Sequence, residues 1–144
     1  FSYSAEGYLT GIVENIDNTE YSSTSLTYEN GDITSISSKM NGLENKFIYE
    51  PGEESSTYHL PCLGLLEIHP LTFHIEALYA GLLGKDPRHF TMHSCPAGSN
   101  DEKTIYSYEF DKKGNPSRMI CQTTYAGGQA SYYPYTRNIS ISFE

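Results

Sequence analysis

The chain is poor in basic residues and has no long apolar run. Of its 144 residues nine are Lys or Arg, against 18 Asp or Glu, which gives a net charge of −9. The basic residues are scattered, apart from the pair Lys112-Lys113. Because nucleic acids and anionic membranes are bound through clustered positive charge, we expect neither as a partner. No stretch approaches the roughly 20 apolar residues of a membrane helix, so the chain is predicted not to span a membrane.

Cysteine is scarce and tryptophan is absent. Cys62, Cys95 and Cys121 are odd in number and lack C-x-x-C spacing. A disulfide between two of them stays open, because the sequence does not choose the pair. The simplest interpretation is three small buried apolar residues. In contrast, the chain has 13 Tyr and 6 Phe, and tyrosine suits a half-exposed sheet because it is apolar with a polar tip.

Three segments share a repeated pattern, in which an aromatic residue precedes a glycine and the glycine precedes an apolar residue by five positions. The three copies are Phe1-Ser2-Tyr3 with Gly7 and Ile12, Leu26-Thr27-Tyr28 with Gly31 and Ile36, and Tyr108-Glu109-Phe110 with Gly114 and Met119. Such a unit is typical of a β-hairpin, because glycine adopts the positive φ that tight turns require.

Further alternating segments complete the predicted fold. The clearest is Ile139-Ser140-Ile141-Ser142-Phe143, with one apolar and one polar face. The spacing of strands and turns predicts about eight or nine strands. We therefore expect residues 1–144 to form a single, mostly β domain, either a curved antiparallel meander or an open or partial barrel.

One segment departs from this pattern. Leu71, Ile75, Leu78 and Leu82 recur at helical spacing, with Pro70 before them and Gly84 after them. Proline is favoured in the first turn of a helix and glycine just past its end. The spacing predicts a single amphipathic helix over about residues 70–83, packed on the sheet.

The end of this segment carries a resemblance. Tyr79-Ala80-Gly81-Leu82-Leu83-Gly84-Lys85, followed by the hairpin around 106–111 and by Gly114-Asn115-Pro116, resembles an uncharacterised bacterial family, domain of unknown function 4595 with a porin-like fold. Its members are secreted, often lipid-anchored proteins of Gram-negative gut anaerobes with no recorded activity. The resemblance implies export to the periplasm or the cell surface. The abrupt beginning at Phe1 fits a targeting segment removed before it.

The histidines are the residues that could form a metal site. His89-x-x-x-His93-x-Cys95 supplies three candidate zinc ligands, but a fourth ligand would have to come from His69 or His74. Solvated or half-buried loop histidines are the simpler interpretation. No G-x-S-x-G motif or other convergent catalytic set is present. We therefore expect no enzyme, no catalytic residues and no cofactor.

Two functions remain, with a hydrolase or metal-dependent enzyme using the loop histidines as a third. The first is a binding module whose concave face holds an unknown small molecule, a glycan or a protein. Its candidate lining residues are Tyr28, Tyr49, Phe110 and Tyr133, and core packing is the alternative for each. The second is an assembly component that pairs through exposed strand edges near Phe1 and Phe143.

Overall fold

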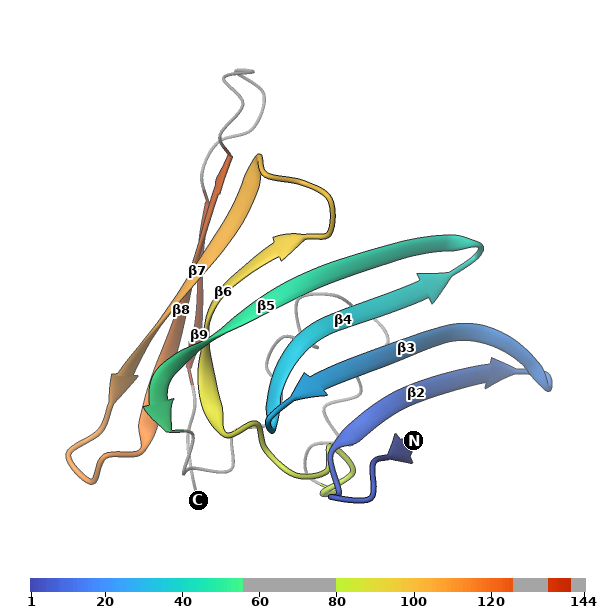
Figure 1. Cartoon of the computed structure of the whole chain (residues 1–144), viewed down its shortest axis with the longest axis horizontal. Helices are drawn as coiled ribbons and strands as arrows, with labels where there is room; N and C mark the ends of the chain where they lie inside the picture. The colour runs from blue at the N-terminus through green and yellow to red at the C-terminus, as the bar shows by residue number, and fades with distance from the viewer. Residues whose placement is uncertain (56–79, 126–134, 141–144) are drawn as a thin grey trace.

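The computed structural model describes residues 1–55, 80–125 and 135–140, and these form one nine-stranded antiparallel sheet (Figure 1). Its strands are β1 (Ser2–Tyr3), β2 (Leu9–Ile16), β3 (Thr19–Glu29), β4 (Asp32–Met40), β5 (Leu43–Ser55), β6 (His89–Pro96), β7 (Glu102–Phe110), β8 (Pro116–Tyr125) and β9 (Tyr135–Ser140). Each strand pairs with its neighbour in sequence, and β1 and β9 are the two edges. The predicted mostly β, open meander is confirmed.

The sheet is strongly curved, and its turns alternate between two ends (Figure 1). The strands β2 to β5 run at a steep angle to β7, β8 and β9. The β1–β2, β3–β4 and β7–β8 turns lie at the same end of the sheet. Most of the predicted helix over 70–83 lies outside the described residues, and its last four positions form turns. The part of the chain that the structure describes contains no helix.

Three hairpins close through two-residue turns. The central residues are Asp17-Asn18 with φ of +50° and +61°, Asn30-Gly31 with +53° and +87°, and Asn41-Gly42 with +52° and +78°. Positive φ at both positions is the pattern of a type I′ turn, whose twist matches that of the flanking strands. Asn, Asp and Gly tolerate this region, so the turn chemistry of the sequence fixes these three connections.

The first and third copies of the repeat close in the same way. In the first, the backbone N–H of Ser4 donates to the Tyr8 carbonyl at 2.8 Å, and in the third that of Asp111 donates to the Asn115 carbonyl at 2.7 Å. The glycine of each copy donates back to Ser4 or Asp111, at 3.1 and 3.0 Å. Both glycines have positive φ, +90° and +86°. Two of the three copies of the repeat therefore share one backbone geometry, whereas the second closes through the two-residue Asn30-Gly31 turn.

The apolar core lies on one face of the sheet. Leu26, Ile36 and Phe47 form one cross-strand row on β3, β4 and β5. The larger cluster contains Leu9, Leu26, Ile33, Ile36, Tyr49 and Leu83, and a smaller one on β7 and β8 contains Tyr106, Met119 and Cys121. Burying one such aliphatic side chain contributes about 1.5–3 kcal/mol. Neither Cys95 nor the buried Cys121 is in a disulfide.

Part of the buried surface is polar. Ser94, Thr104 and Thr123 lie in one cross-strand row on β6, β7 and β8, and all three are buried. Thr104 Oγ1 and Thr123 Oγ1 are 2.9 Å apart, and Ser94 Oγ is 2.7 Å from the Tyr106 hydroxyl. Buried hydroxyls need partners, and adjacent strands provide them here.

Candidate functional site

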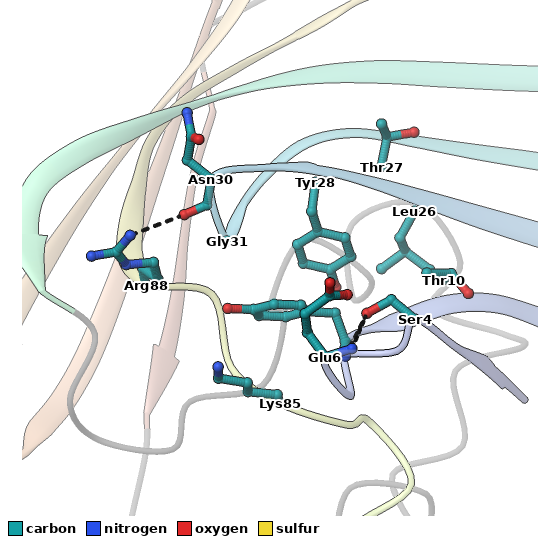
Figure 2. A pocket seen from close by; sticks show the side chains of 11 residues that line it. Ser4, Glu6, Thr10, Leu26, Thr27, Tyr28, Asn30, Gly31, Lys85 and Arg88 are labelled. Atoms are coloured by element: carbon teal, nitrogen blue, oxygen red, sulfur yellow. Dashed lines mark hydrogen bonds between the residues drawn. The ribbon is translucent and has the colours of Figure 1, made fainter.

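A pocket of about 780 Å³ lies beside the β1–β2 and β3–β4 turns (Figure 2). We call it the hairpin pocket. Its walls are formed by Ser4, Glu6, Tyr8, Thr10, Leu26, Thr27, Tyr28, Asn30, Gly31, Lys85 and Arg88. The lining therefore combines two aromatic rings, two cations and one carboxylate with hydroxyl and amide groups.

The two tyrosines form a stacked pair in this pocket. The ring centroids of Tyr8 and Tyr28 are 4.9 Å apart, with an interplanar angle of 30°. The ammonium group of Lys85 lies over the Tyr8 ring, 4.9 Å from its centroid, in a cation–π contact. Tyr8 is 7% exposed, while Tyr28 is half-buried. Tyr28 is thus the more exposed residue of the pair.

The first turn of the sheet fixes the position of Lys85. The Lys85 backbone N–H donates to the Gly7 carbonyl at 2.8 Å, and the Tyr3 hydroxyl donates to the Leu82 carbonyl at 2.8 Å. Gly84 has a φ of +70°, and a Cβ there would lie 2.7 Å from the Gly7 oxygen. This close approach requires glycine at position 84.

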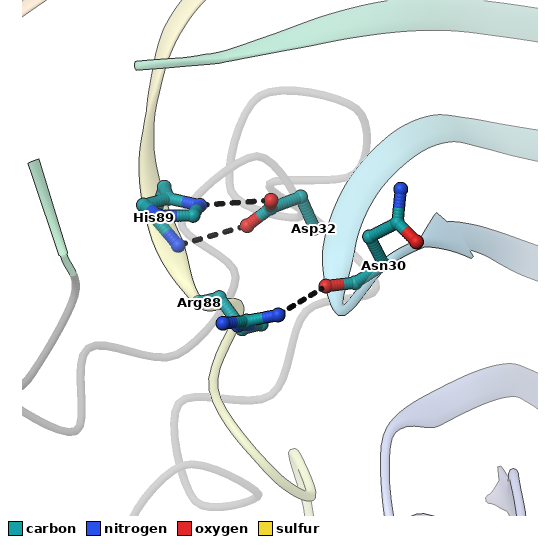
Figure 3. Close-up of polar contacts among 4 residues, drawn as sticks. All are labelled: Asn30, Asp32, Arg88 and His89. Atoms are coloured by element: carbon teal, nitrogen blue, oxygen red, sulfur yellow. Dashed lines mark hydrogen bonds and ion pairs between the residues drawn. The ribbon is translucent and has the colours of Figure 1, made fainter. Parts of the chain in front are cut away.

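The β3–β4 turn holds the next residues in the same manner (Figure 3). The Arg88 backbone N–H donates to the Gly31 carbonyl at 3.0 Å, and its guanidinium donates to the Asn30 carbonyl at 3.4 Å. The carboxylate of Asp32 accepts the His89 backbone N–H at 2.8 Å and lies 2.9 Å from His89 Nδ1. Asp32 is 8% exposed. Two chain segments 57 residues apart are therefore joined by a two-point contact.

The charge of the hairpin pocket is positive in an acidic protein. Lys85 and Arg88 face one carboxylate, that of Glu6. A hydrogen bond with Ser4 lowers the pKa of Glu6 below its ordinary 4.5, with a smaller contribution from Lys85, so Glu6 is charged at neutral pH. Among the residues that the structure describes, neither Lys85 nor Arg88 has an ion-pair partner within 4.0 Å.

The candidate metal ligands are directed to different partners. His89 contacts Asp32, whereas His93 Nδ1 lies 3.1 Å from Glu50 Oε2. Cys95 is half-buried and pairs across the strand with Ile48. Within residues 1–55, 80–125 and 135–140, no three His, Cys, Asp or Glu side chains are grouped so as to hold a metal ion. His59, His69 and His74 lie outside the described residues.

The three candidate lining residues that the structure describes, Tyr28, Tyr49 and Phe110, lie in different places. Tyr28 lines the hairpin pocket, whereas Tyr49 is 3% exposed and belongs to the core. Phe110 is 41% exposed and lines a second pocket of about 560 Å³, beside Met92. Tyr133 lies outside the described residues.

Sequence reasoning missed Tyr8, Glu6, Lys85 and Arg88 as lining residues of one pocket. One signal was present, because Gly7 and Gly31 were matched repeat glycines and a meander places alternate turns at the same end. The position of the segment 85–88 beside those turns carries no comparable signal.

The fold and the sequence together define the class of protein, an antiparallel β domain of porin-like type. The family model for the domain of unknown function (DUF4595) with porin-like fold matches residues 1–118. The chain belongs to this family, as the resemblance around 79–85 indicated. No curated protein matches the chain.

A solved structure supports the same assignment. The crystal structure of a porin-like protein from Bacteroides uniformis aligns with a TM-score of 0.76 and 26% sequence identity. The alignment covers 95% of this chain and 54% of that protein, so the chain spans about half of its length. Among the described residues, no helix has the length and apolar character needed to cross a membrane.

Proposed function

We propose that the chain is a non-enzymatic binding module whose hairpin pocket takes a small saccharide-like ligand. The observation that carries this proposal is the half-buried ring of Tyr28 beside a rim of hydrogen-bonding groups. Ligand sites combine apolar or aromatic surface with a few polar groups that fix orientation. The pocket volume of about 780 Å³ lies in the range of small-molecule sites.

The lining suits a sugar ring in particular. A pyranose presents an apolar C–H face and a rim of hydroxyls that both donate and accept hydrogen bonds. The Tyr28 ring offers a surface for the C–H face. The hydroxyls of Ser4, Thr10 and Thr27 and the amide of Asn30 offer donors and acceptors to the rim.

The lining also favours binding over hydrolysis. Glycoside hydrolysis generally uses two carboxyl groups on either side of the scissile bond. Glu6 is the one carboxylate among the residues that line the hairpin pocket. No histidine or cysteine is among these lining residues.

Export is part of the proposal. It is supported by the family description, which names a porin-like fold, and by the crystallised relative described as a porin-like protein. We propose that the protein acts in the periplasm or at the cell surface of a Gram-negative gut bacterium, and that its precursor is a lipoprotein. Fractionation of cells carrying the tagged natural gene tests this. Recovery in the cytoplasmic fraction would overturn it.

The binding proposal is tested by calorimetry with a panel of neutral and acidic mono- and oligosaccharides. The substitution Tyr28→Leu keeps apolar bulk and removes the aromatic face. The matched control is Tyr21→Leu, on the same strand but outside the pocket and 39% exposed. We expect saturable binding that weakens about tenfold or more in Tyr28→Leu and is unchanged in Tyr21→Leu. No binding by any saccharide, or equal loss in both variants, would contradict the proposal.

A second candidate function rests on the edge of the sheet. β1 pairs with β2 from Leu9 to Gly11, so within the described residues the outer edge of β2 from Ile12 to Ile16 has no strand beside it. Val13 and Ile16 are 51% and 55% exposed there. Such an edge can accept a strand from another chain.

Assembly through this edge is tested by light scattering over a wide concentration range. We expect a concentration-dependent dimer that Val13→Lys abolishes, because charge on an edge strand opposes pairing. A monomer at every concentration would rule out self-assembly by this route.

A further inference from the structure

Two of the nine basic residues of the chain converge on the hairpin pocket. Lys85 and Arg88 are three positions apart and both line it, with Arg88 beside the β3–β4 turn (Figure 2). Although the protein has a net charge of −9, neither cation has a carboxylate within 4.0 Å among the described residues. The side-chain contacts described for them are with neutral groups, the Tyr8 ring for Lys85 and the Asn30 carbonyl for Arg88, so both positive charges can bind an anion.

The backbones of both residues are held by the turns of the sheet. The Lys85 N–H donates to the Gly7 carbonyl at 2.8 Å, and the Arg88 N–H donates to the Gly31 carbonyl at 3.0 Å. The Arg88 guanidinium donates one hydrogen bond to the Asn30 carbonyl at 3.4 Å, and its other N–H groups can donate to a ligand. Groups that are ordered before binding lose less conformational entropy when the ligand arrives.

We propose that the ligand of the hairpin pocket is an acidic saccharide, whose carboxylate or sulfate is bound by Lys85 and Arg88. This inference rests on the proposed function and names the chemical class of the ligand. Charge-assisted hydrogen bonds to a carboxylate or sulfate are about twice as strong as neutral ones. The planar guanidinium of Arg88 can present two parallel N–H groups to such an oxyanion.

Glu6 sets the orientation of the ligand. Its carboxylate lines the same pocket and is charged at neutral pH. It repels the anionic end of the ligand and accepts hydrogen bonds from neutral sugar hydroxyls. The pocket therefore favours a ligand with its charge at one end, and removal of the Glu6 charge strengthens the binding of acidic sugars.

The experiment compares three probes of matched shape: galactose, galacturonate and galactose 6-sulfate. Their affinities are measured by calorimetry on the wild-type chain and on Lys85→Gln, Arg88→Gln and Glu6→Gln. The matched control is Lys39→Gln, an exposed lysine of β4 outside the pocket. Thermal midpoints of all variants confirm that each is folded.

We expect at least one acidic probe to bind about tenfold more tightly than galactose, with an advantage that shrinks as salt is added. Lys85→Gln and Arg88→Gln remove most of this advantage, because each weakens the binding of the acidic probe far more than that of galactose, whereas Glu6→Gln increases it. Lys39→Gln changes nothing. The acidic probe that binds more tightly shows whether the pocket prefers a carboxylate or a sulfate.

Two results would overturn the inference, and they differ. Equal affinity for galactose and both acidic probes, unchanged by Lys85→Gln, overturns the anionic ligand and leaves the proposed function standing. Absence of binding by all three probes, together with no binding across the saccharide panel, overturns both.

Discussion

Ser4 and Asp111 occupy the same position in two copies of the repeat, and each side chain closes its own turn. Asp111 Oδ1 accepts the backbone N–H groups of Lys113 and Asn115, at 2.8 and 2.9 Å. Ser4 Oγ accepts two backbone N–H groups, each at 3.3 Å, two and four residues further on. Short polar side chains of this kind stabilise turns by binding the backbone just ahead of them.

Asp111 contributes to the loss of folding stability at acid pH. Hydrogen bonds from Asn115 lower the pKa of Asp111 below its ordinary 3.8. A carboxyl with a lowered pKa in the folded state stabilises the fold above its unfolded pKa, and this contribution is lost as the pH falls through the folded pKa. A carbon-detected NMR titration should place the Asp111 midpoint below 3.8.

The variant Asp111→Asn gives the control for this titration. The variant lacks the titrating carboxyl group. Its free energy of unfolding should therefore fall less steeply at acid pH than that of the wild type. A midpoint at or above 3.8 for Asp111, or identical acid limbs for the two proteins, would contradict the assignment.

Two turns of the sheet differ in how closely other residues pack against them. The turns Asn30-Gly31 and Asn41-Gly42 have the same sequence and similar positive φ values. A Cβ on Gly31 would lie 2.6 Å from Arg88 Cδ and 2.7 Å from the Tyr8 hydroxyl, whereas a Cβ on Gly42 would have no atom within 4 Å. The first turn is packed into the hairpin pocket, and the second has open space beside it.

Alanine at the two glycines separates backbone strain from packing. Gly42→Ala should cost about 1–2 kcal/mol, the penalty of a side chain in the left-handed region. Gly31→Ala should cost about 1–3 kcal/mol more, because Arg88 and Tyr8 must move. Urea unfolding of both variants measures the difference. Equal losses would show that the packing around Gly31 contributes nothing.

The buried hydroxyl pair of β7 and β8 gives a second prediction for the elements. Thr104→Val leaves the Thr123 hydroxyl buried without its 2.9 Å partner, which should cost about 1–3 kcal/mol. The double variant with Thr123→Val removes both polar groups at nearly constant shape and should recover most of that loss. A double-mutant cycle in urea measures the coupling. Simple additivity of the two losses would contradict it.

The strands and turns were predictable because their signals are local. Alternation, Asn-Gly pairs and the repeat glycines each act within about ten residues of chain. The buried row of Ser94, Thr104 and Thr123 was not predictable, since Ser and Thr are usually exposed and the pairing register decides their burial. The helix predicted over 70–83 lies almost wholly outside the described residues.

On the scale of the whole molecule, the segment from Leu82 to His89 connects two turns of the sheet. It binds the β1–β2 turn through Lys85 and the β3–β4 turn through Arg88 and His89. This segment supplies both cations of the hairpin pocket. The integrity of the candidate site therefore depends on contacts between residues far apart in sequence.

Gly84→Ala tests this dependence. A Cβ at position 84 meets backbone atoms, the Gly7 oxygen at 2.7 Å and the Leu9 nitrogen at 2.9 Å, which cannot rotate away. We expect faster hydrogen exchange at the Lys85 amide, which donates to Gly7, and weaker saccharide binding. Gly81→Ala is the control, because its φ of +69° is similar and a Cβ there has no atom within 4 Å. Equal exchange in the two variants would contradict the account.

The site itself was only partly visible in the sequence. Tyr28 was identified as a candidate lining residue, and it does line a pocket. Tyr49, proposed on the same grounds, is buried in the core cluster against which the half-buried Tyr28 packs, and the sequence does not distinguish their degrees of burial. Lys85 belonged to the stretch that carried the family resemblance, yet its place beside Tyr8 follows from a long-range contact.

The most direct test of the central claim is where a saccharide binds. The amide signals of the ¹⁵N-labelled chain are followed by NMR during titration with galacturonate and galactose. We expect saturable shifts concentrated in residues 4–10, 26–31 and 85–88, the three segments that line the hairpin pocket. Shifts centred on the second pocket around Phe110, or no saturable shifts, would contradict it.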